Sequence, residues 1–192
     1  MRIFVAGASG AIGVPLVRLL VAAGHTVAGM TRSEAKVPML RELGAEPVVC
    51  NVYDAAALER TVVAFRPDAV IHELTDLPDD ERELRGSTDA NARMREEGTR
   101  NVIAAAQAAG ASRLLVQSIA FRPQGGGSPE RFERPVLDAG GVVLRYGYFY
   151  GPGTWHPDGR APDPAIHVEE AARRTVEALD APSGVIEVVE GA

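Results

Sequence analysis

Three glycines near the amino terminus have the spacing of a loop that can hold a pyrophosphate. The stretch RIFVAGASGAIGVPLVRLLVAAGHTV places them between a strand-like apolar run and an amphipathic run. Glycines permit a tight turn and a close approach of the backbone, and the helix that follows adds free N–H donors and a partial positive charge. Strand, loop, helix and second strand come in the required order, so the stretch predicts a dinucleotide site, with a ligand-free tight turn as the alternative. The expected contacts are Gly7, Ser9, Gly10, Ala11, Ile12 and Gly13.

The side chains after the second strand-like run indicate which dinucleotide is bound. An NAD site usually has Asp or Glu here to bind the ribose hydroxyls. This sequence instead has Thr31, Arg32 and Ser33, and a guanidinium with a neighbouring hydroxyl suits a 2′-phosphate. We therefore expect NADP more than NAD, with an ordinary exposed loop arginine as the alternative. Asn51 and Val52, at the end of the third run, are expected to face the adenine, although a plain polar loop would look the same.

Polar residues after later predicted strands are candidates for the reacting end of the site, because ligands of such sheets bind at the carboxyl edge. Glu73, Thr75 and Asp76 follow the fourth strand-like run, and Thr75 is expected to touch the nicotinamide ribose. Ser118 ends the fifth run, where it could bond a substrate carbonyl. We expect it to be a neighbour of the cofactor more than a catalyst, and a polar loop is the default for the other three.

Three alternating tyrosines offer a substitute proton donor. Tyr146, Tyr148 and Tyr150 would share one face if the sixth strand extended through them, and Tyr148 is the weak catalytic candidate. Aromatic packing of a central strand and its loop is the favoured interpretation. His72 lies within an apolar run and is expected to be a satisfied structural histidine rather than a base.

The elements that must position these residues alternate along the chain, which is typical of βαβ units and a parallel sheet. Strands are expected near 2–6, 25–30, 46–50, 69–73, 113–118, 142–147 and 185–189, and helices near 11–23, 33–43, 54–65, 88–109, 130–139 and 168–180. Gly24 and Gly44 sit just past helices, and Asp54 can cap the third helix. Right-handed crossovers then predict an α/β Rossmann fold, a three-layer doubly wound parallel sheet with strand order 3-2-1-4-5-6-7.

Composition restricts the class of protein. A chain of 192 residues with 46% hydrophobic content suits one domain, 1–192, and a net charge of −6 argues against a nucleic-acid partner. No apolar run approaches the roughly 20 residues that cross a bilayer. The lone Cys50 suits a reducing compartment, and the four histidines match no metal-ligand spacing. We expect a cytoplasmic monomer or homodimer without a metal, bound to a dinucleotide and to an unknown small-molecule substrate.

Four stretches together resemble the extended and atypical branch of the short-chain dehydrogenase/reductase superfamily, the NAD(P)-dependent epimerase/dehydratase-like enzymes. They are the GxxGxxG loop, EEGTRNVIAAAQAAGASRLLVQS at 96–118, VVLRYGYFYGPG at 142–153 and IHVEEAARRTVEAL at 166–179. The resemblance spans nearly the whole chain. It implies an NAD(P) cofactor, oxidoreductase or epimerase chemistry, and an active-site serine at Ser118.

The sequence also departs from that family. The family's tyrosine acid/base and the lysine four residues later have no counterpart, since the only lysine is Lys36, on the adenine side. We therefore expect little or no oxidoreductase turnover. The substrate lobe is expected to be nearly absent, because only a loop at 151–165 replaces it and the chain ends just after the last strand. A linker-like segment at 122–129 stands where the catalytic helix is expected, either as an engineered bridge in a miniaturised protein or as a natural loop.

Together these observations predict an NADP(H)-binding Rossmann protein related to short-chain dehydrogenases/reductases. One alternative is a cofactor-responsive regulator of the NmrA type, which binds NADP without reducing anything. Another is an engineered minimal Rossmann scaffold that binds no cofactor.

Overall fold

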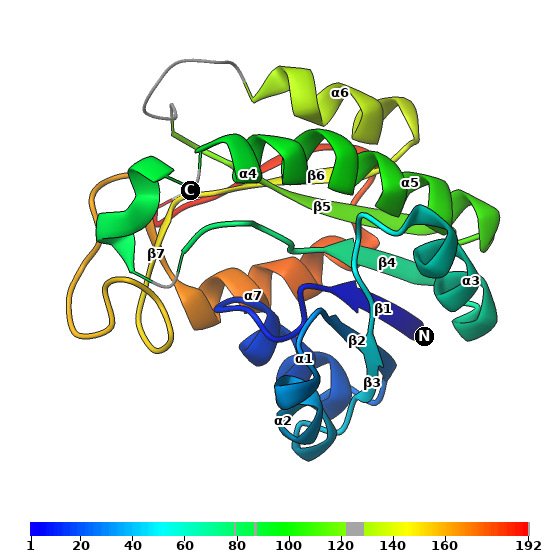
Figure 1. Ribbon diagram of the computed structural model, residues 1–192. Helices are drawn as coiled ribbons and strands as arrows, with labels where there is room; N and C mark the ends of the chain where they lie inside the picture. Colours follow the sequence, from blue (N-terminus) through cyan, green and yellow to red (C-terminus); the bar gives the residue numbers. More distant parts are fainter. Residues whose placement is uncertain (79, 87, 122–128, 192) are drawn as a thin grey trace.

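A parallel sheet of seven strands forms the centre of the molecule (Figure 1). The computed structural model describes residues 1–78, 80–86, 88–121 and 129–191, so the expected linker at 122–129 lies, apart from Pro129, outside the described residues. The strands are β1 (Arg2–Ala6), β2 (Thr26–Thr31), β3 (Glu46–Val49), β4 (Ala69–His72), β5 (Arg113–Ile119), β6 (Val142–Tyr146) and β9 (Gly184–Val188). Their order is β3-β2-β1-β4-β5-β6-β9, and all six pairings are parallel. The predicted order is confirmed, with β9 as the seventh predicted strand.

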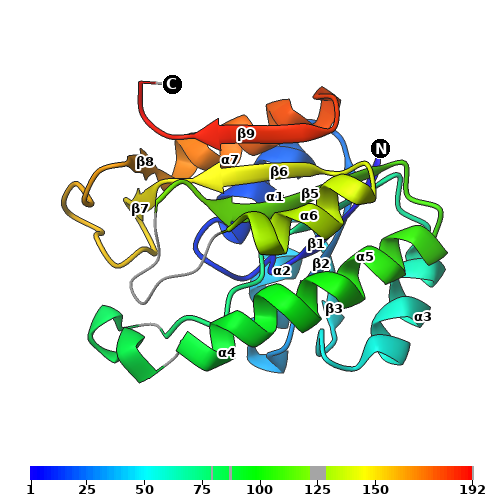
Figure 2. The same cartoon turned by 90° about the horizontal axis from the view of Figure 1, so that it is seen from above.

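Helices cover both faces of this sheet, as the predicted three-layer fold requires (Figures 1 and 2). One face carries α1 (Gly13–Ala22), α2 (Val37–Glu42) and α7 (Val168–Glu177). The other carries α3 (Ala55–Phe65), α4 (Thr88–Arg93), α5 (Thr99–Ala108) and α6 (Glu130–Asp138). Single 3₁₀ turns span Glu34–Lys36, Glu81–Gly86 and Ala178–Asp180, and a π turn, Met94–Gly98, joins α4 to α5.

The alternation of side chains along the strands gives each face its own core. Ile3 and Val5 of β1 pack with α1 and α7, whereas Phe4 and Ala6 pack with α3 and α5. Apolar strands of this kind are stable only when both faces are covered. Full burial of each large side chain contributes about 1.5 to 3 kcal/mol.

The marked helix ends also behave as predicted. Gly24 and Gly44 adopt φ angles of +82° and +85°, which an L side chain rarely adopts. Asp54 caps α3 by accepting a hydrogen bond of 2.9 Å from the backbone N–H of Ala57. The predicted helix over 88–109 is confirmed, since α4, the π turn and α5 follow one another without a gap from Thr88 to Ala108. The π turn was not predicted, and it ends at Gly98, where a Cβ would lie 2.7 Å from the sulfur of Met94.

The condition under which Tyr146, Tyr148 and Tyr150 would share one face of a strand is not met. β6 ends at Tyr146, and β7 (Tyr148–Tyr150) pairs instead with β8 (Ala165–His167) in a separate two-stranded sheet. Gly147 makes this change of partner possible: a Cβ there would lie 2.6 Å from the carbonyl oxygen of Pro164. The backbone at Gly147 and the backbone at Pro164 therefore lie in close contact just after the end of β6.

Candidate dinucleotide-binding site

Two glycines of the loop after β1 are required by the fold itself. Gly7 has φ +94°, and a Cβ there would lie 2.8 Å from the backbone carbonyl carbon of Glu73. A Cβ on Gly13 would lie only 2.1 Å from the carbonyl oxygen of Gly7. The loop is also tied to β2, because the N–H groups of Gly7 and Ala8 both donate to the carbonyl of Met30, at 3.3 and 3.1 Å. These contacts fix the loop but need no ligand.

Gly10 is different, because the protein's own packing barely uses its lack of a side chain. It is exposed, and a Cβ there would meet one atom, the carbonyl oxygen of Gly7 at 3.3 Å. Within the described ranges the N–H groups of Ala11 and Ile12 have no acceptor, and α1 has neither a side-chain cap nor an acid in its first turn. α3, by contrast, is capped by Asp54. The bare loop surface and uncapped helix end thus fit an anionic pyrophosphate.

A short hydroxyl chain joins the loop to the end of β2. Ser9 Oγ lies 3.0 Å from Thr31 Oγ1, and Thr31 Oγ1 accepts a hydrogen bond of 3.2 Å from the backbone N–H of Ser33. Thr31 is buried, so its role in this structure is to hold the loop against the strand. Ser33 is half-buried beside it.

Arg32 reaches across the site instead of pointing into solvent alone. Its Nη1 donates to Asp76 Oδ1 over 2.9 Å, with side-chain exposures of 70% for Arg32 and 20% for Asp76. Asp76 comes from the loop after β4, and its own N–H donates to Asn91 Oδ1 at 3.3 Å. A carboxylate therefore holds the guanidinium that the sequence assigns to the 2′-phosphate. That pairing joins positions 44 residues apart and was not foreseen.

Tyr53 is a neighbour of this pair that sequence reasoning missed. Its ring lies under the guanidinium of Arg93, 4.0 Å from the centroid, and its hydroxyl is buried without a partner among the residues that the structure describes. Burial, and then the negative charge of Asp76, raise the pKa of Tyr53. The sequence signal that could have identified Tyr53 is its position directly after Asn51 and Val52. Of those two, Asn51 is exposed and accepts from the N–H of Tyr53 at 3.1 Å, whereas Val52 is buried in the core.

Ser118 lies at the other end of the site and is bound to a buried ion pair. Its Oγ donates to Glu133 Oε1 at 2.6 Å, and Arg145 donates to both oxygens of Glu133 at 2.8 and 2.6 Å. Burial alone would raise the pKa of the Glu133 carboxyl, but the hydrogen bonds from Arg145 and Ser118 lower it overall. The hydroxyl proton of Ser118 is thus directed to Glu133 and away from a substrate carbonyl. Neither partner was singled out from the sequence.

His72 is the satisfied structural histidine that the sequence predicts. Its Nδ1 accepts from the backbone N–H of Leu74 and its Nε2 lies 3.1 Å from Thr99 Oγ1, so the tautomer that carries its proton on Nε2 is fixed. Burial lowers the pKa of the imidazole to about 4. The ring is therefore neutral at physiological pH, and a small cavity of about 20 Å³ separates it from Ser118 and Glu133.

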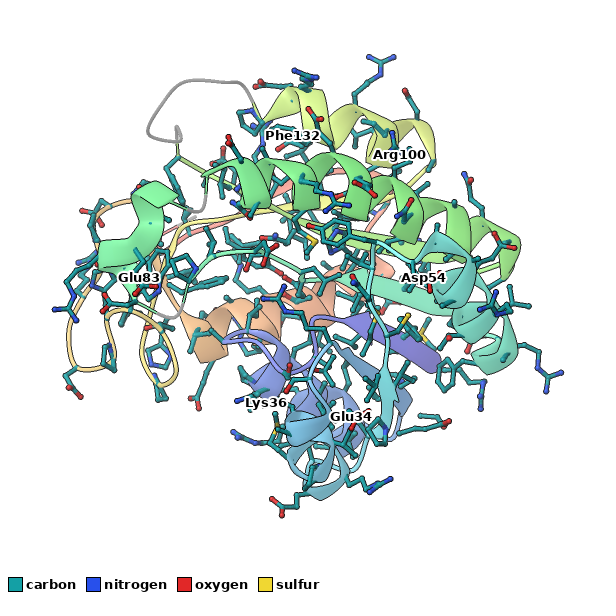
Figure 3. The ribbon with its side chains drawn as sticks, in the orientation of Figure 1. Glu34, Lys36, Asp54, Glu83, Arg100 and Phe132 are labelled. Carbon is teal, nitrogen blue, oxygen red and sulfur yellow. The ribbon has the colours of Figure 1, made fainter. Side chains whose placement is uncertain are left out.

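The remaining predicted positions lie on the surface side of the site. Tyr148 is half-buried and stacks on Phe121 with ring centroids 3.8 Å apart. Burial raises the pKa of its phenol, and the negative charge of Glu81 adds to that shift. Thr75 is exposed. Figure 3 shows Lys36, the only lysine of the sequence, on the far side of the sheet from the α6 residue Phe132, so no lysine accompanies Ser118.

Comparison with known proteins decides the family. The family described as NAD(P)H-binding matches residues 7–139, from the first glycine of the loop to the end of α6. The chain belongs to the NAD(P)H-binding family. The expectation of a Rossmann domain of an NAD(P)-binding family is confirmed with it.

Relatives of this NAD(P)H-binding protein include an enzyme of similar sequence. The chain is 39% identical over 183 residues to a 3-diazoavenalumate denitrifying reductase of a Streptomyces species, covering 80% of this chain and 58% of the reductase. It also matches an uncharacterized protein of Schizosaccharomyces pombe, 44% identical over 72 residues, covering 38% of this chain and 24% of that protein. The chain thus spans less than two thirds of the curated relatives that it matches.

Solved structures of the same fold include epimerases. The UDP-glucose 4-epimerase of Thermus thermophilus, in complex with NAD, superposes with a TM-score of 0.80 at 21% identity, covering 100% of this chain and 78% of the epimerase. The enzyme of Thermotoga maritima, with UDP-glucose, gives 0.80 at 18% identity and the same coverage. At these identities the likeness concerns the fold. In the ranges that the structure describes, no helix is long and apolar enough to cross a membrane.

Proposed function

We propose that this protein binds NADP(H) across the carboxyl edge of its sheet. The pyrophosphate would lie on the unpaired N–H groups of Ala11 and Ile12, over the bare surface of Gly10. Arg32 would exchange its ion pair with Asp76 for one with the 2′-phosphate, and Ser33 would lie beside that phosphate. The observation that carries the proposal is the uncapped start of α1 behind a glycine loop, in a chain of the NAD(P)H-binding family. A bound reduced nicotinamide supplies a hydride.

The chain's own residues limit what that hydride can do. Reduction of a ketone or aldehyde needs a proton for the new hydroxyl, and the site holds no Tyr-x-x-x-Lys pair to supply it. Ser118, the candidate at the proposed nicotinamide end of the site, directs its proton to Glu133. We therefore propose little or no turnover with carbonyl compounds or sugar nucleotides.

The Streptomyces relative favours a second candidate, reduction of a diazo compound. Replacement of a diazonium group by hydrogen consumes one hydride, breaks the C–N bond and releases dinitrogen, so the two electrons of the hydride balance the positive charge. This reaction needs no proton from a side chain of the enzyme. It is compatible with a site that binds and orients but lacks an acid.

Parallel titrations with NADPH and NADH, followed by nicotinamide fluorescence and melting temperature, test the binding proposal. Saturable binding with tighter NADPH supports it, and no binding of either nucleotide overturns it in favour of a ligand-free scaffold. The loss of NADPH absorbance with an aryl diazonium salt, compared with an aryl aldehyde, tests the chemistry. Consumption with the aldehyde alone would overturn the proposed restriction.

A further inference from the structure

Glu73 is a buried acid in direct contact with the glycine loop. Its backbone packs against Gly7, as the 2.8 Å approach of a Cβ to its carbonyl carbon shows. Its side chain is 7% exposed, and Oε1 lies 3.0 Å from the hydroxyl of Tyr146 at the end of β6. That hydroxyl lies 2.6 Å from Thr175 Oγ1 on α7. The carboxyl thereby links the ends of β4 and β6 to the helix behind the sheet.

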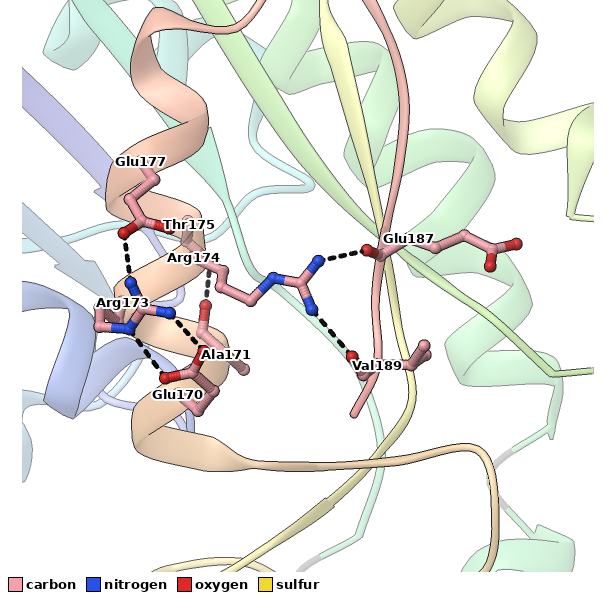
Figure 4. Close-up of polar contacts among 8 residues, drawn as sticks. All are labelled: Glu170, Ala171, Arg173, Arg174, Thr175, Glu177, Glu187 and Val189. Atoms are coloured by element: carbon pink, nitrogen blue, oxygen red, sulfur yellow. Dashed lines mark hydrogen bonds and ion pairs between the residues drawn. The ribbon is translucent and has the colours of Figure 1, made fainter. Parts of the chain in front are cut away.

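The hydrogen bonds around Tyr146 indicate whether the Glu73 carboxyl is protonated. Thr175 donates its single proton to the carbonyl oxygen of Ala171 at 2.8 Å, as Figure 4 shows, so its oxygen can only accept from Tyr146. The hydroxyl of Tyr146 then has one proton for two neighbours: if it donates to Glu73 Oε1, the 2.6 Å contact with Thr175 has no proton, and if it donates to Thr175, the contact with Glu73 takes its proton from the carboxyl. A phenol that donates to a carboxylate lies at about 2.5 to 2.7 Å. The observed 3.0 Å fits a neutral acid better.

The surroundings of Glu73 support the same assignment. Tyr146 faces it from β6, Thr175 completes the chain from α7, and the loop after β1 contributes only Gly7. Burial raises the pKa of the Glu73 carboxyl to about 8, although the hydrogen bond with Tyr146 acts against this rise. In the described part of the chain, no charged side chain contributes to the shift.

We propose that Glu73 is a positioning residue that keeps its proton at neutral pH, and that loss of this proton in alkaline solution loosens the glycine loop and weakens dinucleotide binding. A carboxylate here would have no cation to pair with, and it would compete with Thr175 for the proton of Tyr146. The end of β4, which packs on Gly7, would then lose its link to β6 and α7. The binding part of this inference rests on the proposed function.

The direction of the pH effect follows from the raised pKa. The folded-state value of about 8 exceeds the ordinary glutamate value. The stability that depends on Glu73 is therefore complete below the ordinary pKa and is lost progressively as the pH rises through about 8. If only the protonated form holds the loop, affinity falls by up to about tenfold per pH unit above 8.

The test compares the wild-type protein with Glu73→Gln, whose amide donates to Tyr146 at every pH. We measure the NADPH dissociation constant from pH 7 to 9.5, where the charge of the 2′-phosphate changes little. We measure the cofactor-free melting temperature from pH 4.5 to 9.5, because the stability is lost between the ordinary glutamate pKa and about 8. The inference predicts that the wild-type affinity and melting temperature fall while those of Glu73→Gln stay nearly level. Parallel profiles for the two proteins would overturn it.

Two further readouts keep the inference separate from the proposed function. If NADPH binds at no pH, the proposed function fails, and the cofactor-free melting temperatures still decide whether Glu73 holds a proton. If Glu73→Gln does not fold, infrared difference spectra of the wild-type protein between pH 7 and 9.5 show the loss of a protonated carboxyl band. A spectrum without that loss contradicts the assignment.

Discussion

Single residues in the glycine loop serve two distinct purposes. Gly7 and Gly13 are required because a Cβ would meet backbone atoms at 2.8 and 2.1 Å. Gly10 is exposed and has only one close neighbour, so its lack of a side chain leaves a surface open to a ligand. The sequence predicts all three glycines from spacing alone. It cannot separate packing from binding, because that distinction depends on contacts of the folded loop with itself and with Glu73.

Arg32 is the residue that we propose binds the 2′-phosphate. We expect Arg32→Ala to weaken NADPH binding by about tenfold or more, since a charge-assisted hydrogen bond contributes about 1.5 to 3 kcal/mol. NADH binding should change by less than about twofold. Fluorescence titration measures both constants, with Arg41→Ala, an exposed arginine on α2, as the control. An equal loss for the two nucleotides would assign Arg32 to a general electrostatic role.

In the proposed complex, Asp76 would compete with the 2′-phosphate for the guanidinium of Arg32. Because the Arg32–Asp76 pair must break before Arg32 binds a phosphate, Asp76→Asn should tighten NADPH binding several-fold and leave NADH nearly unchanged. The gain is modest, since exposed ion pairs contribute about 0.2 to 1 kcal/mol. Isothermal titration of both nucleotides checks it. Weaker NADPH binding by Asp76→Asn would mean that the carboxylate orients Arg32 instead of competing for it.

At the scale of elements, helix ends and strand ends decide where the site lies. The start of α1 is uncapped, whereas α3 is capped by Asp54 and α7 by His167, whose Nδ1 accepts from the N–H of Glu169. The sequence predicts the Asp54 cap, because a cap is a local feature, whereas the uncapped start of α1 and the His167 cap emerge only from the structure. The sequence does not foretell β7 and β8, since three-residue strands are defined by their partner and not by their own pattern. The Glu133–Arg145 pair was also missed, because its two residues come from different elements, α6 and β6, that meet only in the folded structure.

That ion pair should stabilise the contact of α6 with the sheet. Glu133 is 3% exposed and accepts from Ser118 as well as from Arg145, so Glu133→Gln leaves a partly buried guanidinium without its counter-charge. We expect a loss of about 1 to 3 kcal/mol in the free energy of unfolding. Urea denaturation measures it, with Arg134→Ala on the exposed side of α6 as the control. Equal stability of wild type and Glu133→Gln would show that the pair contributes nothing.

For the whole molecule, the doubly wound sheet brings the candidate residues to one edge. The predicted strand order is confirmed: the central strands β1 and β4 are almost fully buried, whereas the edge strands β3 and β9 are partly exposed. The order places the loops after β1, β2, β4 and β5 side by side, which puts the glycine loop, Arg32, Asp76 and Ser118 on that edge. The pairings across the edge join distant parts of the chain and emerge only from the folded structure.

The most direct test of a dinucleotide site at the glycine loop is NADPH binding by Gly10→Asp. The added Cβ meets only the carbonyl oxygen of Gly7, at 3.3 Å, and a shift of a few tenths of an ångström in the loop relieves this contact, so the protein should fold. The added charge would lie where the pyrophosphate is proposed to bind. Gly159→Asp, at an exposed glycine with no atom near its Cβ, adds the same charge elsewhere. We predict that Gly10→Asp abolishes measurable NADPH binding at an unchanged melting temperature, while Gly159→Asp binds like the wild type. Wild-type affinity in Gly10→Asp would contradict the account.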